Sequence, residues 1–122
     1  AAACRGCADG GGTSIGLLPG NDRADANPWV TIAVPTGLGE ARNALVVRAA
    51  DAVVAVGGGY GTLAEIALAL RAATPVVGLD TWEPVIAGRR DHGIVLAAGA
   101  EEAVTLAMRL AGDLPGRRRS DG

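Results

Sequence analysis

The sequence predicts an α/β protein with a Rossmann-like fold: an open, mostly parallel sheet with helices on both faces. Apolar segments of strand length alternate with helix-length segments along the chain. Two of these segments, residues 52–56 and 75–79, are continuously apolar, which is typical of strands buried on both faces of a parallel sheet. A glycine-rich loop at residues 57–61 joins the first of these strands to a helix, as expected at the carboxyl edge of such a sheet.

Each element follows from a local pattern. Glycine and proline mark the ends of segments, and apolar residues at helical spacing, as at Leu45, Val46 and Ala49, mark helices. We expect helices at 1–9, 40–50, 62–73, 83–87 (a short one) and 101–110, and strands at 15–18, 30–34, 52–56, 75–79 and 94–97. A polar loop at 21–28 connects the first two strands. The helix at 62–73 has an apolar stripe of Leu63, Ile66, Ala67 and Leu70.

The domain organisation is expected to be simple. Residues 1–111 are long enough for one domain, and the glycine- and arginine-containing residues 112–122 are expected to form a flexible, solvated tail. A doubly wound domain rarely starts inside a helix, and residue 1 is alanine rather than methionine. We therefore expect a leading strand and helix of the domain to be missing from this sequence.

The composition excludes several mechanisms. The 122 residues include 11 arginines and no lysine. A phosphate loop of the GxxxxGK[ST] type needs its lysine, and a pyridoxal-phosphate enzyme needs a lysine for its Schiff base, so both classes are excluded for this chain. Alanine supplies 25 residues and aromatic residues only 2 % of the chain, so the core must be built from small side chains. Such a core favours stabilisation by self-association, and we expect a homodimer or a higher homo-oligomer.

Charge and hydropathy give further exclusions. The net charge is −2, so nothing indicates a nucleic-acid-binding protein. The longest charge-free segment, residues 52–64, is too short and too rich in glycine to cross a membrane, and no basic-then-apolar signal segment opens the sequence. We expect a cytoplasmic protein.

The residues that most often bind metals are sparse. Cys4 and Cys7 have CxxC spacing, but no second pair or histidine cluster completes a zinc site. We therefore expect two buried, small apolar side chains on one helix face; a redox or metal role is the alternative. His92 is the only histidine and has no evident partner. No metal site and no tightly bound cofactor are expected.

The glycine loop is the most informative segment. Gly57, Gly58, Gly59 and Gly61 lie between a buried strand and a helix that carries Thr62. Glycines there let backbone N–H groups approach an anion, and the helix dipole adds positive potential, so the pattern favours a phosphate site. The alternative is that the glycines only form a tight turn.

Two roles remain open for Glu65. With Thr62 it matches a capping box, in which Thr62 caps the helix and Glu65 returns to the cap amide. Beside a bound phosphate, its carboxylate could instead act as an acid or base or bind a ribose hydroxyl.

Arg42 lies in the first turn of its expected helix, where the helix dipole disfavours a cation. That placement indicates an anionic partner, either a carboxylate of the protein or a ligand phosphate, and Asn43 could bond the same ligand. A solvated or purely structural arginine is equally compatible with the sequence.

These residues resemble the LOG-like (LONELY GUY) superfamily of Rossmann-type proteins. The resemblance is carried by residues 35–43 (PTGLGEARN), 50–52 (ADA) and 58–65 (GGYGTLAE), and it extends to about residue 110. The superfamily includes nucleoside 5′-monophosphate phosphoribohydrolases, molybdenum-cofactor carrier proteins, and members labelled as lysine decarboxylases. Residues 2–11 look like the helix that follows the family's first glycine-rich loop, which agrees with a missing leading segment.

In the hydrolase branch of the superfamily the motif is PGGxGTxxE. The resemblance implies phosphate binding by Gly58, Gly59, Gly61 and Thr62, and a catalytic pair formed by Glu65 and Arg42. Gly57 stands at the motif's proline position and Asn43 at a position where hydrolases usually have lysine, and both departures look more like the branch that contains the cofactor carriers.

The sequence therefore predicts a protein that binds a nucleotide 5′-monophosphate or a similar phosphorylated ligand at residues 57–62, with Asn43 as a further ligand contact. One hypothesis adds N-glycosidic hydrolysis to free base and ribose 5-phosphate. The alternative is a non-catalytic carrier or sensor of a phosphorylated cofactor such as molybdenum cofactor. A pyridoxal-phosphate lysine decarboxylase is excluded, because the chain has no lysine.

Overall fold

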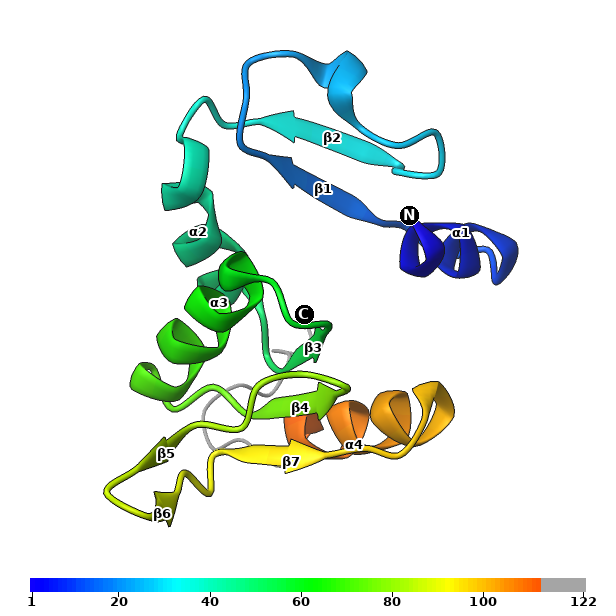
Figure 1. Cartoon of the computed structure of the whole chain (residues 1–122). Coiled ribbons are helices and arrows are strands. Elements are labelled where there is room, and N and C mark those ends of the chain that lie inside the picture. Colours follow the sequence, from blue (N-terminus) through cyan, green and yellow to red (C-terminus); the bar gives the residue numbers. More distant parts are fainter. Residues whose placement is uncertain (113–122) are drawn as a thin grey trace. The chain divides into compact units, whose positions relative to one another are not determined.

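The computed structural model describes residues 1–112 and divides into two compact units, Ala1–Val46 and a second unit that begins at Val47 (Figure 1). Each unit has its own parallel sheet. This mixed α/β architecture with parallel strands confirms the predicted fold class. Apart from Gly112, the expected tail lies outside the described residues.

The first unit contains a two-stranded parallel sheet. Strands β1 and β2 pair in register from Ile15 with Ile32 to Leu18 with Pro35. Thr36 lies just beyond β2, and its hydroxyl donates a hydrogen bond of 2.6 Å to the Leu18 carbonyl. This bond links the carboxyl ends of the two strands. The unit's elements are α1 (Ala2–Asp9), β1 (Ile15–Leu18), the 3₁₀ turn η1 (Arg23–Asp25), β2 (Ile32–Pro35), the 3₁₀ turn η2 (Gly39–Ala41) and the start of α2 (Arg42–Ala49).

The second unit contains a three-stranded parallel sheet in the order β3-β4-β7. The elements after α2 are β3 (Val53–Val56), α3 (Tyr60–Arg71), β4 (Val76–Leu79), β5 (Val85–Ile86), β6 (Arg89–Arg90), β7 (Ile94–Leu96) and α4 (Ala100–Gly112). The central strand β4 is buried along Val76, Val77 and Gly78, as its continuously apolar sequence predicts.

Helices cover both faces of β4. Val76 belongs to a core cluster with Ile66 and Ala69 of α3, all three fully buried. Val77 is also fully buried but points to the opposite face, because successive strand side chains alternate. That face is covered by α4, which packs against β4 and buries Ala103 (Figure 1).

Strand β3 differs from its expected burial. Val53 and Ala55 are buried, but the side chains of Val54 and Val56 are 42 % and 58 % exposed. The prediction of burial on both faces was therefore wrong for β3 in the described structure. The reason is unequal cover of one face: Val54 pairs with Val77 on the face that α4 covers, and α4 packs mainly against the central strand β4 rather than against β3.

The prediction of a short helix at residues 83–87 was also wrong, because this segment contributes to an antiparallel hairpin of β5 and β6. Ala87 and Gly88 form its two-residue turn, and both have positive φ, 50° and 78°. Two such residues are typical of the type I′ turn, whose twist matches a hairpin. The β-branched pair Val85 and Ile86 also favours a strand over a helix.

Other boundaries shift by a few residues. The strand expected at 30–34 is Ile32–Pro35, and α3 begins at Tyr60 rather than at residue 62. The expected apolar stripe of α3 is shifted as well, because Ile66 and Ala69 are its buried residues while Ala67 is exposed. Within residues 1–112, no helix has the length and hydrophobicity required to cross a bilayer.

Candidate functional site: a glycine loop at the carboxyl edge of the sheet

The glycine loop follows β3 at the carboxyl edge of the three-stranded sheet. The last residue of β3, Val56, pairs with Leu79, the last residue of the neighbouring parallel strand β4. Residues 57–59 then connect β3 to α3, which begins at Tyr60 (Figure 1). In open α/β sheets this edge is where ligands bind.

The glycines of the loop have different structural requirements. Gly57 has φ of 87°, a left-handed conformation that favours glycine. Gly58, Gly59 and Gly61 do not have positive φ, and a Cβ atom added at any of them would meet no protein atom outside its own neighbourhood within 4 Å. A tight turn therefore accounts for glycine at position 57 but not at the other three positions.

The start of α3 presents backbone donors at this loop. Gly59 is the N-cap residue, with extended φ and ψ of −69° and 153° and no capping side chain. The Leu63 amide donates to the Gly59 carbonyl over 3.1 Å, so the amides of Tyr60, Gly61 and Thr62 precede the first intrahelical bond. Three successive amides at the positive end of a helix dipole form a suitable environment for an anion.

The helix start also decides between the structural interpretations of Glu65. Because Gly59 is the cap, Thr62 is the third helical residue rather than the cap, and the capping box is not formed. Glu65 lies three residues after Thr62 and is half-buried. Residues three apart are neighbours on a helix surface, so Glu65 lies about one turn beyond Thr62 on the same side of α3.

Arg42 and Asn43 belong to the first unit. Arg42 is the first residue of α2, and its Nη1 donates to the Leu17 carbonyl, near the carboxyl end of β1, over 2.8 Å. The partner found for this cation is therefore a backbone carbonyl rather than a carboxylate. A guanidinium carries five N–H donors, so this bond leaves capacity for an anion. Asn43 is only 7 % exposed.

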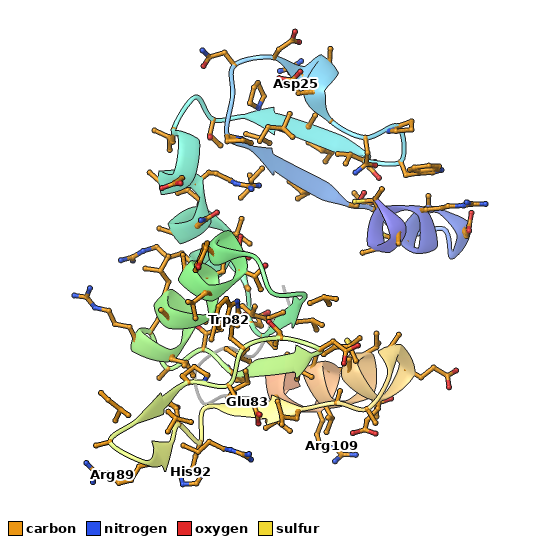
Figure 2. The ribbon with its side chains drawn as sticks, viewed as in Figure 1. Asp25, Trp82, Glu83, Arg89, His92 and Arg109 are labelled. Carbon is orange, nitrogen blue, oxygen red and sulfur yellow. The ribbon has the colours of Figure 1, made fainter. Side chains whose placement is uncertain are left out.

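Sequence reasoning missed two residues that contact the glycine loop. Thr81 and Trp82 follow β4 at the same sheet edge, and Figure 2 shows Trp82 beside α3. The Thr81 hydroxyl donates to the Gly57 carbonyl over 2.6 Å, and Trp82 Nε1 donates to the Gly59 carbonyl over 3.2 Å. Their position directly after the next parallel strand was the available signal, because the carboxyl ends of neighbouring strands meet at one edge.

The other candidate residues lie elsewhere. Cys4 and Cys7 are free thiols in α1 that are half-buried, so the prediction that they are buried was wrong; α1 has no fully buried residue. His92 is exposed just after β6, and Figure 2 shows its side chain near that of Arg89. His92, Arg89 and Arg90 line an open hollow of about 510 Å³. Across residues 1–112, no three histidine, cysteine or acidic side chains gather in a group that could hold a metal ion.

The fold and the loop define a Rossmann-like protein with a glycine-rich strand–helix junction. The chain belongs to the SLOG cluster4 family, whose model matches residues 1–107. This match confirms the prediction that the chain is a member of the LOG-like superfamily.

Three relatives illustrate the similarity. An uncharacterized protein of Archaeoglobus fulgidus is 38 % identical over 103 residues, which cover 84 % of this chain and 64 % of that protein. The molybdenum cofactor binding protein of Rippkaea orientalis is similar in structure, with a TM-score of 0.75 and 31 % sequence identity. The match covers 88 % of this chain and 68 % of the Rippkaea orientalis chain. The molybdenum cofactor carrier protein of Chlamydomonas reinhardtii gives a TM-score of 0.73 and 38 % sequence identity. This match covers 90 % of this chain and 69 % of the Chlamydomonas reinhardtii chain.

Proposed function

We propose that this protein binds a phosphorylated small molecule, a nucleotide 5′-monophosphate or a phosphorylated pterin cofactor, with its phosphate against residues 57–62. The role we favour is that of a carrier or sensor that holds such a molecule without transforming it. In this proposal the amides around Gly58, Gly59 and Gly61 and the hydroxyl of Thr62 bond the phosphate oxygens.

The observation that carries the proposal is the conformation of the loop. Neither backbone strain nor protein packing requires glycine at positions 58, 59 and 61, because φ is not positive there and an added Cβ would contact nothing. Glycine at these positions leaves the backbone amides open to close approach by a ligand. The uncapped start of α3 supplies the matching positive potential.

The carrier role is supported by the relatives. Two of the similar solved structures are of proteins named for binding or carrying molybdenum cofactor, and they are 31 % and 38 % identical to this chain. Asn43, which stands where the hydrolase branch usually has lysine, agrees with that role. The cofactor would be cargo, bound through its phosphate and released intact.

Hydrolysis of a nucleoside monophosphate to free base and ribose 5-phosphate is the second candidate. It is favoured by the position of Glu65, which lies about one helical turn beyond Thr62 of the proposed phosphate site. In this mechanism Glu65 would act on the ribose or the attacking water, and Arg42 would orient the sugar phosphate. The hydrogen bond to the Leu17 carbonyl orients the Arg42 side chain within the first unit.

One experiment separates these functions. The protein is incubated with a panel of nucleoside 5′-monophosphates and with neopterin monophosphate, and both binding and free base are measured. Binding without release of base supports the carrier, whereas release that is lost in Glu65→Gln supports the hydrolase. If no phosphorylated ligand binds, the proposed site is wrong.

The proposal includes self-association. Val104 and Met108, four residues apart on α4, have side chains that are 60 % and 72 % exposed, and an apolar pair on one helix face favours contact with a second copy. Sedimentation of the protein should show a homodimer or a larger assembly. Replacement of both residues by glutamate should shift it to the monomer, and a purely monomeric parent protein would contradict this part of the proposal.

A further inference from the structure

Tyr60 is the most exposed large hydrophobic residue in residues 1–112, at 83 %. A single exposed aromatic side chain is ordinary on a protein surface. The position of this one is not: Tyr60 is the first residue of α3 and lies between Gly59 and Gly61 of the proposed phosphate site. An aromatic side chain is thus attached to the backbone that would contact the phosphate.

The Tyr60 ring is held in place from one side. It stacks on the Trp82 ring with a centroid separation of 5.9 Å and an angle of 29° between the planes. Trp82 is itself fixed to the loop, because its Nε1 donates to the Gly59 carbonyl, and it packs against the hydrophobic core. The stacked pair is therefore anchored both to the glycine loop and to the body of the second unit.

This arrangement leaves most of the Tyr60 ring accessible. Stacking on Trp82 uses one face, and an exposure of 83 % requires the other face and the ring edge to be open. A ring that is already oriented loses little conformational freedom when a second ring stacks on it. Every nucleobase and pterin is a flat ring system that can stack in this way.

We propose that Tyr60 is the stacking platform for the planar heteroaromatic ring of the ligand whose phosphate occupies the glycine loop. Trp82 is then a positioning residue, which acts through Tyr60 and through the Gly59 carbonyl. The inference rests on the proposed function and adds a selectivity to it: the site prefers phosphorylated molecules that carry a flat ring over phosphorylated sugars.

The test compares ligands with and without a ring. Binding of AMP, neopterin monophosphate and ribose 5-phosphate is measured by calorimetry on the parent protein, Tyr60→Phe and Tyr60→Ala. Stacking on an aromatic side chain contributes about 1–3 kcal/mol, so Tyr60→Ala should lower the affinity for the ring-bearing ligands about 5- to 150-fold. The affinity for ribose 5-phosphate should change less than about twofold. Tyr60→Phe should bind all three ligands like the parent protein, because it keeps the ring.

Trp82 provides an independent readout. With Trp29→Phe, Trp82 becomes the only tryptophan of the chain, and its fluorescence should change on addition of the ring-bearing ligand but much less with ribose 5-phosphate. Trp82→Phe keeps a stacking ring and removes the N–H donor, so it should lower the affinity for ring-bearing and ringless ligands to a similar, small extent.

The outcomes distinguish the two claims. Equal losses for AMP and ribose 5-phosphate in Tyr60→Ala, or no loss for either, overturn the stacking platform while leaving the phosphate site in place. Failure of all three ligands to bind the parent protein overturns the proposed function, and the platform with it. A loss confined to the ring-bearing ligands supports the platform.

Discussion

The hydroxyl of Thr81 donates a hydrogen bond of 2.6 Å to the carbonyl oxygen of Gly57. The bond joins residues that follow two neighbouring parallel strands, since Gly57 comes after β3 and Thr81 after β4. Gly57 has a left-handed backbone conformation that turns the chain toward α3, and the Thr81 hydroxyl holds the Gly57 carbonyl in place at this turn. We infer that Thr81 sets the orientation of the first peptide of the glycine loop.

Replacement of Thr81 tests that role. Thr81→Val keeps the shape of the side chain and removes the donor, while Thr81→Ser keeps the donor. A typical protein hydrogen bond contributes about 0.5–1.5 kcal/mol, so Thr81→Val should weaken ribose 5-phosphate binding about 2- to 12-fold. Thr81→Ser should bind like the parent protein. Equal affinity of the Val and Ser variants would show that the bond does not shape the site.

Gly78 is expected to be intolerant of a side chain because of its contacts with Thr81 and β7. A Cβ at Gly78 would lie 2.9 Å from Thr81 Cγ2 and 3.1 Å from Ile94 Cδ1. Gly78→Ala should lower the free energy of unfolding by about 1–3 kcal/mol through overpacking, and displacement of Thr81 should also weaken ligand binding. Urea unfolding measures the first effect. Gly6→Ala is the control, because Gly6 is exposed within α1 and a Cβ there meets no atom beyond its own helix backbone and chain neighbours within 4 Å. Equal losses of stability in the two variants would contradict the packing described.

Asp80 places a negative charge at the edge that we assign to phosphate. It is exposed, directly precedes Thr81 and has φ of 48°. Asp80→Asn removes the charge and keeps a side chain that tolerates the left-handed conformation. Affinity for ribose 5-phosphate should rise about 1.5- to 5-fold at low salt, as expected for an exposed charge pair, and the gain should shrink at high ionic strength. A fall in affinity would indicate that Asp80 binds the ligand itself.

Glu65→Gln separates binding from catalysis. Glutamine has nearly the same shape but cannot transfer a proton, so phosphate-ligand affinity should remain within about threefold of the parent protein if Glu65 has only a chemical role. In a hydrolase, release of free base should fall by about 10²-fold or more. A large loss of affinity together with a lower melting temperature would instead assign Glu65 a structural role in α3.

Patterns that depend on local physics were predictable from the sequence. Strand β1 at Ile15–Leu18 has the expected bounds, and the central strand β4 is buried as its continuous apolar run predicts. The position of the glycine loop between β3 and α3 was likewise visible, because glycines after an apolar strand leave few alternatives.

Features set by neighbours could not be predicted in the same way. Val54 and Val56 look identical to buried strand residues in sequence, and they are exposed because α4 covers their face of the sheet mainly over β4. The hairpin depends on Ala87 adopting a positive φ that alanine seldom has. The contacts of Thr81 and Trp82 with the loop involve residues more than twenty positions away in the chain, which local patterns do not reveal.

The most direct test of the central claim is the affinity of Gly58→Ala for a phosphorylated ligand. The added methyl group would meet no protein atom beyond its chain neighbours within 4 Å and requires no positive φ, so the variant should unfold at a temperature no lower than that of the parent protein. If the loop amides bind phosphate, calorimetry with AMP and ribose 5-phosphate should show roughly a tenfold or greater loss of affinity for both ligands in Gly58→Ala and none in the control Gly6→Ala. Unchanged affinity in a stably folded Gly58→Ala variant would contradict the assignment of residues 57–62 as the phosphate site.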